Sequence, residues 1–168
     1  MSGTVIILFL LFLLIFSLLS FNITKENLDG VECNNQWDEN TNCYSYVMGN
    51  NTLRSWDEQQ PGYSNNFPEM DNDDVTCENI EHRFMSDNKK IYKVDNCDTT
   101  CSENNRKIFL SVDPTKDYHF YREDNKGEWS YKEGSSKPRC GLPDPWKMER
   151  QIGEYNYKDA CGCYCVPI

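Results

Sequence analysis

The pattern of hydrophobic residues divides the chain into an apolar leader and a long polar remainder. From Thr4 to Phe21 every residue is apolar or a small hydroxyl residue, and none is charged. This length lies in the overlap between the apolar core of a signal peptide and a membrane-spanning helix. No clean small-residue cleavage site follows, and no basic residue precedes the stretch to set its orientation. Residues 1–21 are therefore predicted to be an apolar helix that anchors the chain in a membrane through residues 4–21, or a cleaved signal peptide.

Shorter hydrophobic patterns behind the leader predict one α+β domain over residues 41–168, joined by a stalk over residues 22–40 that is rich in Asn, Asp and Glu. Helical spacing predicts a short helix over Cys43–Met48, capped by Thr41 or Asn42, and a longer acidic helix over Asp74–Ser86. Residues 51–73 are predicted to form a loop with a turn at Pro61-Gly62.

Aromatic and β-branched residues predict a series of strands after the second helix. Two turn sequences, at 113–116 and 124–127, make the last three of the series an antiparallel meander. The chain after Pro138 is predicted to be irregular until a terminal strand that carries three cysteines. The predicted strands before it are Ile91–Val94, Lys107–Val112, Asp117–Glu123 and Gly127–Lys132.

The formal net charge of −10 lies entirely outside the leader. Such acidity argues against nucleic acid and against anionic lipid surfaces, because both require cationic contacts. Two glycosylation sequons occur, at Asn22 and Asn50, and they are weak indications of export. No cofactor motif is present, and the sequence specifies no oligomeric state.

The nine cysteines are a stronger indication of export, because this density is typical of oxidising compartments. An odd number leaves one thiol over or bridged to a partner chain. In a strand, the run Cys161-Gly162-Cys163-Tyr164-Cys165 would place three sulfurs on one face. A thiolate zinc site involving this run is the alternative, but its spacing does not match the usual two short-spaced pairs. The disulfide candidates are Cys33, Cys77, Cys97, Cys101, Cys140, Cys161, Cys163 and Cys165.

Cys43 is the candidate for the remaining thiol. At the start of a helix its pKa would be lowered, which favours the reactive thiolate. His119, in the strand-like Asp117–Arg122, would be its base. The alternatives are that Cys43 is half of a disulfide and that His119 simply packs in the sheet. His82 is expected to be a solvated helix residue, and Asp71–Asp74 to be a solvated loop or helix cap rather than a calcium loop.

The order of a helix that bears Cys43 and an antiparallel sheet with His119 on a strand resembles the papain-like cysteine peptidase and amidase superfamily, most of all its CHAP and NlpC-type branch. Five motifs in order resemble, more narrowly, a group of small bacterial and viral proteins. The resemblance implies a papain-like layout, with a nucleophile-bearing helix packed on an antiparallel sheet and stapled by disulfides. The motifs are Asn42-Cys43-Tyr44-x-Tyr46, Pro61-Gly62, Asp117-Tyr118-His119-Phe120-Tyr121-Arg122, Trp129-Ser130 and Cys161-Gly162-x-x-Cys165-Val166-Pro167.

The same resemblance implies that Cys43 attacks a carbonyl carbon and that His119 moves the proton. Its third residue, which orients the histidine, falls near Tyr131, where tyrosine departs from the superfamily's usual His or Asn. Glu128 or Ser130 could serve instead if the hairpin register differs by a residue. The Cys43 N–H would bind the oxyanion; Gln36 lies in the right region for a second donor, but its spacing is not the usual one.

The sequence thus predicts an exported or membrane-anchored thiol hydrolase. It would cleave amide bonds of a peptide or a peptidoglycan-like stem peptide through a Cys43 thioester. The domain would lie on the extracytoplasmic side of a membrane or be secreted. The alternative is a non-catalytic disulfide-rich surface or virion membrane protein that keeps the scaffold for structural or binding use.

Overall fold

The computed structural model describes residues 31–33, 37, 39–51, 55–125 and 127–168. The predicted apolar helix over residues 4–21, the Asn22 sequon and Gln36 lie outside these ranges. Within them, no helix combines the length and the apolar character needed to cross a membrane.

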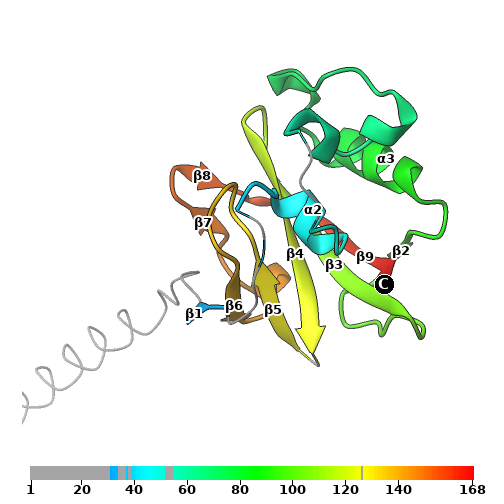
Figure 1. Ribbon diagram of the computed structural model, residues 1–168. Helices are drawn as coiled ribbons and strands as arrows, with labels where there is room; N and C mark the ends of the chain where they lie inside the picture. Colours follow the sequence, from blue (N-terminus) through cyan, green and yellow to red (C-terminus); the bar gives the residue numbers. More distant parts are fainter. Residues whose placement is uncertain (1–30, 34–36, 38, 52–54, 126) are drawn as a thin grey trace, which may run out of the picture.

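The domain is α+β, and its centre is a seven-stranded antiparallel sheet with strand order β1-β6-β5-β4-β3-β9-β2 (Figure 1). A two-stranded hairpin, β7-β8, lies apart from it. The strands are β1 (Val31–Glu32), β2 (Tyr92–Val94), β3 (Asn105–Asp113), β4 (Asp117–Asn125), β5 (Glu128–Tyr131), β6 (Arg139–Leu142), β7 (Gln151–Ile152), β8 (Tyr155–Asn156) and β9 (Asp159–Pro167).

The predicted meander is confirmed, since β3, β4 and β5 are consecutive neighbours, and it continues into β6. The prediction of irregular chain after Pro138 is wrong, because β6, a 3-10 turn over Pro145–Lys147 and the β7-β8 hairpin lie there. These strands have two to four residues each, too short for a hydrophobic period to show in sequence. β1 pairs with β6, so part of the predicted stalk belongs to the sheet.

The two α-helices lie on one face of the sheet. α2 (Cys43–Val47) crosses β4, and α3 (Cys77–Asp87) lies on the same side, near β9 (Figure 1). The Asn42 side chain caps α2 by accepting from the Ser45 N–H at 2.9 Å. Thr76 caps α3, so this helix starts three residues later than its periodicity suggested. The residues before it, Asn72–Asp74, form a 3-10 turn closed by a capping box.

Each face of the sheet has its own hydrophobic core. On the helix face, α2 and α3 pack against alternate residues of the central strands, including Leu110, Phe120 and Tyr164. On the opposite face, the β7-β8 hairpin and Trp146 pack against an aromatic group that includes Phe109, Tyr121 and Trp129. The sheet is therefore a middle layer, which explains why its central strands are almost continuously buried.

Four disulfides join the predicted eight cysteines, as Cys33–Cys140, Cys77–Cys161, Cys97–Cys163 and Cys101–Cys165. The zinc alternative is thereby excluded for these residues. They indicate folding in an oxidising compartment. Cys43 is the free cysteine, as predicted.

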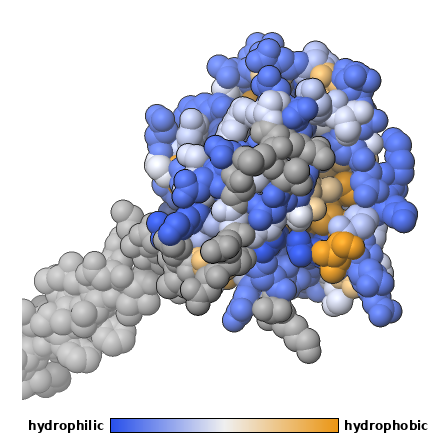
Figure 2. Space-filling view, in the orientation of Figure 1, coloured by the Kyte–Doolittle hydropathy of each residue, from blue (hydrophilic) through white to orange (hydrophobic). Residues whose placement is uncertain are grey.

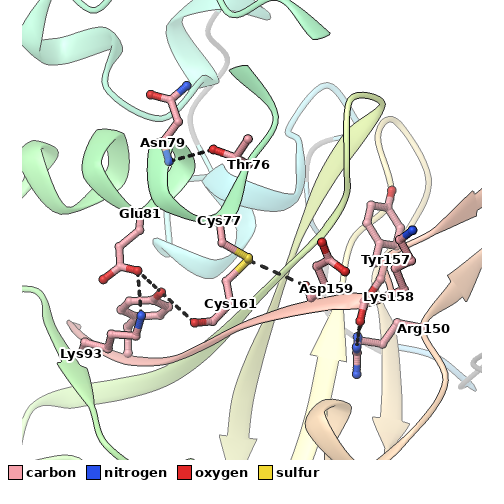
Figure 3. The surroundings of a disulfide bond; sticks show 11 residues. Thr76, Cys77, Asn79, Glu81, Lys93, Arg150, Tyr157, Lys158, Asp159 and Cys161 are labelled. Carbon is pink, nitrogen blue, oxygen red and sulfur yellow. Dashed lines mark hydrogen bonds and ion pairs between the residues drawn. A yellow bond between two sulfur atoms is a disulfide. The ribbon is translucent and has the colours of Figure 1, made fainter. Parts of the chain in front are cut away.

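The prediction that the three sulfurs of β9 share one face is wrong. The register between β3 and β9 shifts at Leu110/Ser111, which leaves Cys161 as an extra residue in the strand. Cys161 turns to the helix face and joins Cys77 of α3 (Figure 3). Cys163 is buried on the opposite face. Gly162 has a φ of 133°, which only glycine adopts readily, and it permits this bulge.

The face of the protein in Figure 2 is mostly hydrophilic, and hydrophobic residues occupy only small areas of its described surface. This agrees with the acidic composition of the domain and its net charge of −10.

Candidate functional site

Cys43 and His119 both line a cavity of about 280 Å³ at the end of the sheet where β4 begins. Its walls come from the start of α2, the loop before Pro61, the start of β4, the turn after β5 and the segment around β8. The lining residues are Asn42, Cys43, Trp56, Gln60, Asp117, Tyr118, His119, Glu133, Gly134, Tyr155 and Tyr157.

The start of α2, and with it Cys43, is held by hydrogen bonds to a buried glutamine. The Asn42 backbone N–H donates to Gln59 Oε1 at 2.8 Å, and the Asn42 side-chain amide donates to the Gln59 carbonyl at 3.0 Å. The next residue, Gln60, accepts from the Tyr118 hydroxyl. Gly62 then allows the loop to fold back closely: a Cβ there would lie 2.9 Å from the Phe67 ring. The loop therefore fixes the nucleophile candidate against β4.

The prediction of a lowered thiol pKa is wrong. Burial, together with the nearby Asp117 carboxylate, raises the pKa of Cys43 to about 12. Backbone N–H groups of Phe120, Tyr44 and Cys43 face the sulfur and lower the pKa, but by less than burial raises it. A five-residue helix has too small a dipole to offset this desolvation. The resting side chain at neutral pH is a neutral thiol.

His119 is 2% exposed and lies among tyrosine rings. Its ring centroid is 5.0 Å from that of Tyr121, 5.2 Å from that of Tyr131 and 5.1 Å from that of Tyr157. Burial lowers the pKa of His119 to about 3, so the imidazole is neutral over the physiological range. Its Nε2 has no hydrogen-bond partner among the described residues. A buried polar atom in this state is uncommon and is often found at functional sites.

The alternation of β4 places the two candidate groups on different sides of the strand. Tyr118 and Phe120 face α2, and His119, between them, faces the opposite core. Cys43 meets this strand at its edge, where its Sγ lies 3.9 Å from the Tyr118 carbonyl oxygen. The paired register of β4 with β5 starts only at Tyr121, which leaves this edge to the cavity. A molecule in the cavity would therefore contact both groups, one from each side.

The third predicted residue, Tyr131, lies beside His119. It is paired with Tyr121 across the β4-β5 ladder, and its ring meets the imidazole edge-on. The two alternative orienting residues, Ser130 and Glu128, do not lie beside the imidazole. The Ser130 hydroxyl is on the helix face, 2.8 Å from the Tyr46 hydroxyl, and Glu128 is exposed. The register thus favours Tyr131 among the three, and its role as an orienting residue stays a prediction.

Two residues at the cavity were not singled out by sequence. The Tyr157 hydroxyl donates to the Asp117 carboxylate at 2.6 Å, and burial raises the pKa of Asp117. Arg150 places Tyr157 by donating to the carbonyls of Tyr157 and Lys158, both at 2.8 Å (Figure 3). Asp117 is the first residue of the histidine motif, but no role was assigned to it. Tyr157 had no sequence signal, because the hairpin that precedes it was not predicted.

A third overlooked residue, Lys132, is fully buried. Its ammonium donates to the carbonyls of Glu39 at 3.3 Å, Gly134 at 2.6 Å and Thr41. It joins the segment before α2 to the turn after β5, and both border the cavity. The sequence Trp129-Ser130-Tyr131-Lys132 drew attention through its aromatics, and a lysine at the end of a strand is normally expected to be exposed.

The other predicted sites have structural roles or remain predictions. Asp71 caps the 3-10 turn, as expected of a capping residue, and no cluster among the described residues could hold a metal ion. His82 is an exposed residue of α3 whose ring contacts Phe67 edge-on. Asn50 is partly exposed after α2, but its sequon partner Thr52 lies outside the described residues.

Comparison of the chain with protein-family models, with curated proteins and with solved structures finds no match in any of the three. The papain-like resemblance therefore rests on the motifs of the sequence.

Proposed function

We propose that the domain is a thiol-dependent amide hydrolase that acts on peptides or peptidoglycan-like stem peptides. One observation carries the proposal: the single unpaired cysteine of the nine and a buried histidine with an unpartnered Nε2 line the same cavity. The arrangement of an α2-borne cysteine, a histidine on β4 and an aromatic residue on the next strand also agrees with the papain-like layout.

The proposed reaction proceeds in two stages. The Cys43 sulfur attacks the carbonyl carbon while His119 takes the thiol proton, and the C–N bond then breaks as His119 protonates the amine. Water next attacks the thioester, His119 takes its proton, and cleavage of the C–S bond returns the thiol and releases a carboxylic acid. The N–H groups of Cys43, Tyr44 and Phe120 face the sulfur, and in this proposal they bind the negative oxygen that develops beside it.

Because both groups are neutral at rest, the proton must move as the carbon–sulfur bond forms. A resting thiolate–imidazolium pair is strongly disfavoured when the thiol pKa is about 12 and the imidazole pKa about 3. The enzyme would accordingly work by general-base catalysis, and slow alkylation of Cys43 by iodoacetamide at pH 6 is expected even in an active preparation.

The proposal is tested with the full-length chain, disulfides intact, in a mild detergent. Purified peptidoglycan and a set of peptide amides serve as substrates, and amine release is measured. We expect Cys43→Ser to lower the rate by about a thousandfold or more and His119→Gln by about a hundredfold. His82→Gln is the matched control. Acid quenching should trap an acyl group on the Cys43 peptide, detected by mass spectrometry. An undiminished rate in Cys43→Ser would overturn the proposal.

A second function is favoured by the same burial. A neutral thiol and a neutral imidazole that approach β4 from different sides suit a non-catalytic exported module, in which both residues only fill space. This alternative predicts no substrate turnover by the wild-type chain. It also predicts that Cys43→Ala and His119→Phe leave every binding property unchanged.

A further inference from the structure

The charged groups of the Cys43 cavity have one sign. Among its lining residues the ionised side chains at neutral pH are carboxylic acids, Asp117 and Glu133, because the imidazole is neutral. The two larger grooves of the described surface differ, since each is lined by both acidic and basic residues. Two buried cations, Lys132 and Arg150, donate to backbone carbonyls of the lining residues Gly134 and Tyr157, and neither side chain lines the cavity.

The two acids occupy different depths. Asp117 is half-buried on the His119 side of β4, where it accepts from the Tyr157 hydroxyl. Glu133 is exposed in the turn after β5, at the rim. Burial is the main cause of the raised pKa of Asp117, and the charges of Asp113 and Glu133 make smaller contributions in the same direction. Two like charges at one cavity repel each other, and a cation bound beside them would relieve that repulsion.

Aromatic rings complete the surroundings. Trp56 lines the cavity yet is 52% exposed, which is unusual for so large an apolar side chain. Tyr155 and Tyr157 also line the cavity, and their ring planes are inclined by 30° to each other. Such rings attract ammonium and guanidinium groups through their π-faces. Next to them, the unpartnered Nε2 of His119 is an independent sign that a ligand is handled here.

We infer that the cavity selects peptides with a cationic side chain, of the lysine or arginine type, next to the amide that faces Cys43. In this arrangement Glu133 and Asp117 hold the cation, and Trp56 covers its alkyl stem. The inference rests on the proposed function for the identity of the ligand as a peptide, and it adds the specificity of the same site.

The test measures binding rather than turnover, using the full-length Cys43→Ala chain in mild detergent. The probes are acetyl-glycyl-lysyl-glycine amide and the same peptide with norleucine, which keeps the length of the side chain and removes its charge. Calorimetry should show about fivefold tighter binding of the lysine peptide. Glu133→Gln should reduce that preference to about twofold or less. Glu154→Gln, an equal change of charge at an exposed site outside the cavity, should leave it intact.

Equal affinity for the two peptides would overturn the inference, and so would an equal loss of preference in Glu133→Gln and Glu154→Gln, which would indicate non-specific attraction to an acidic protein. The two proposals fail separately. Lysine-selective binding without hydrolysis by the wild type would remove the enzyme and keep the cation site. Hydrolysis of the lysine and norleucine peptides at equal rates would keep the enzyme and remove the cation site.

Discussion

The two sides of strand β4 satisfy their buried polar groups to different degrees. On the helix face, Arg122 donates to the Asp124 carboxylate at 2.7 Å and to the Tyr46 carbonyl at 3.2 Å. The Tyr46 and Ser130 hydroxyls bond to each other, and Lys132 has its three carbonyls. On the opposite face, His119 Nε2 and Trp129 Nε1 have no partner among the described residues. The Tyr121 and Ser111 hydroxyls are neighbours there, yet they do not meet with hydrogen-bond geometry.

The difference separates buried polar groups that stabilise the fold from buried polar groups that are available to interact with a ligand. A buried polar atom without a partner costs about 1–3 kcal/mol of stability. On the helix face one buried atom bears this cost, Arg83 Nε of α3, whereas the polar groups of β4 and β5 on that face have partners. On the opposite face four atoms bear it, and one of them, His119 Nε2, belongs to a residue that lines the cavity. This is where we place the chemistry, and three substitutions sharpen the contrast between the two faces.

Lys132→Met is expected to have the largest effect, because it removes the donor that satisfies three carbonyls around the start of α2. The free energy of unfolding should fall by about 3–5 kcal/mol. The measurement is urea unfolding of the oxidised full-length chain, followed by tryptophan fluorescence, with exposed Lys90→Met as control. A loss as small as that of the control would show that the helix face does not depend on this network.

His119→Phe should behave differently, because it removes an atom that has no partner. At pH 7 the free energy of unfolding should change by no more than about 1 kcal/mol. Below pH 6.5 the unfolded wild type binds a proton that the folded protein, with its imidazole pKa of about 3, does not bind. The free energy of unfolding of the wild type therefore falls as the pH decreases from 6.5 towards 3. The His119→Phe variant has no imidazole at this position, so it does not lose this part of its stability. At pH 4.5 the variant should be favoured by about 2.5 kcal/mol more than at pH 7.

The same urea experiment at pH 7 and pH 4.5 measures this difference, with His82→Phe as the exposed counterpart. If wild type and His119→Phe lost equal stability on acidification, His119 would not be the buried neutral group that the opposite face requires.

Asp87→Asn should change the free energy of unfolding less than Lys132→Met does, and less than acidification changes the difference between wild type and His119→Phe. The carboxylate at the end of α3 connects that helix to α2 and to the loop at Gly62, so its loss weakens the helix face at its margin. Replacing one acceptor oxygen with an amide should lower the free energy of unfolding by about 1–2 kcal/mol, compared with exposed Asp95→Asn under the same conditions. A gain in stability in Asp87→Asn would contradict this prediction. The groups that donate to Asp87 are Tyr44 Oη, Gly62 N, Ser64 Oγ and Asn65 Nδ2.

The sequence by itself determined the α+β class, the two α-helices, the β3-β4-β5 meander and the presence of an odd thiol. These follow from local periodicity, turn residues and the parity of the cysteines, none of which requires knowledge of long-range contacts. The choice of Cys43 as that thiol was a prediction from its position and from the resemblance, and it is confirmed. It also directed attention to His119 and Tyr131, which the sheet register brings together.

Only the tertiary structure decided which cysteines pair, on which face of the sheet the Cys161 sulfur lies, and which protonation states Cys43 and His119 have. The bulge at Cys161 turns its sulfur to α3, and no local pattern encodes a register shift between β3 and β9. Burial raises the pKa of Cys43, against the expectation from the helix start, and burial lowers the pKa of His119. Neither shift could be predicted from sequence, because desolvation depends on every element packed around the group. The short strands around Tyr157 had no readable period, although they complete the cavity.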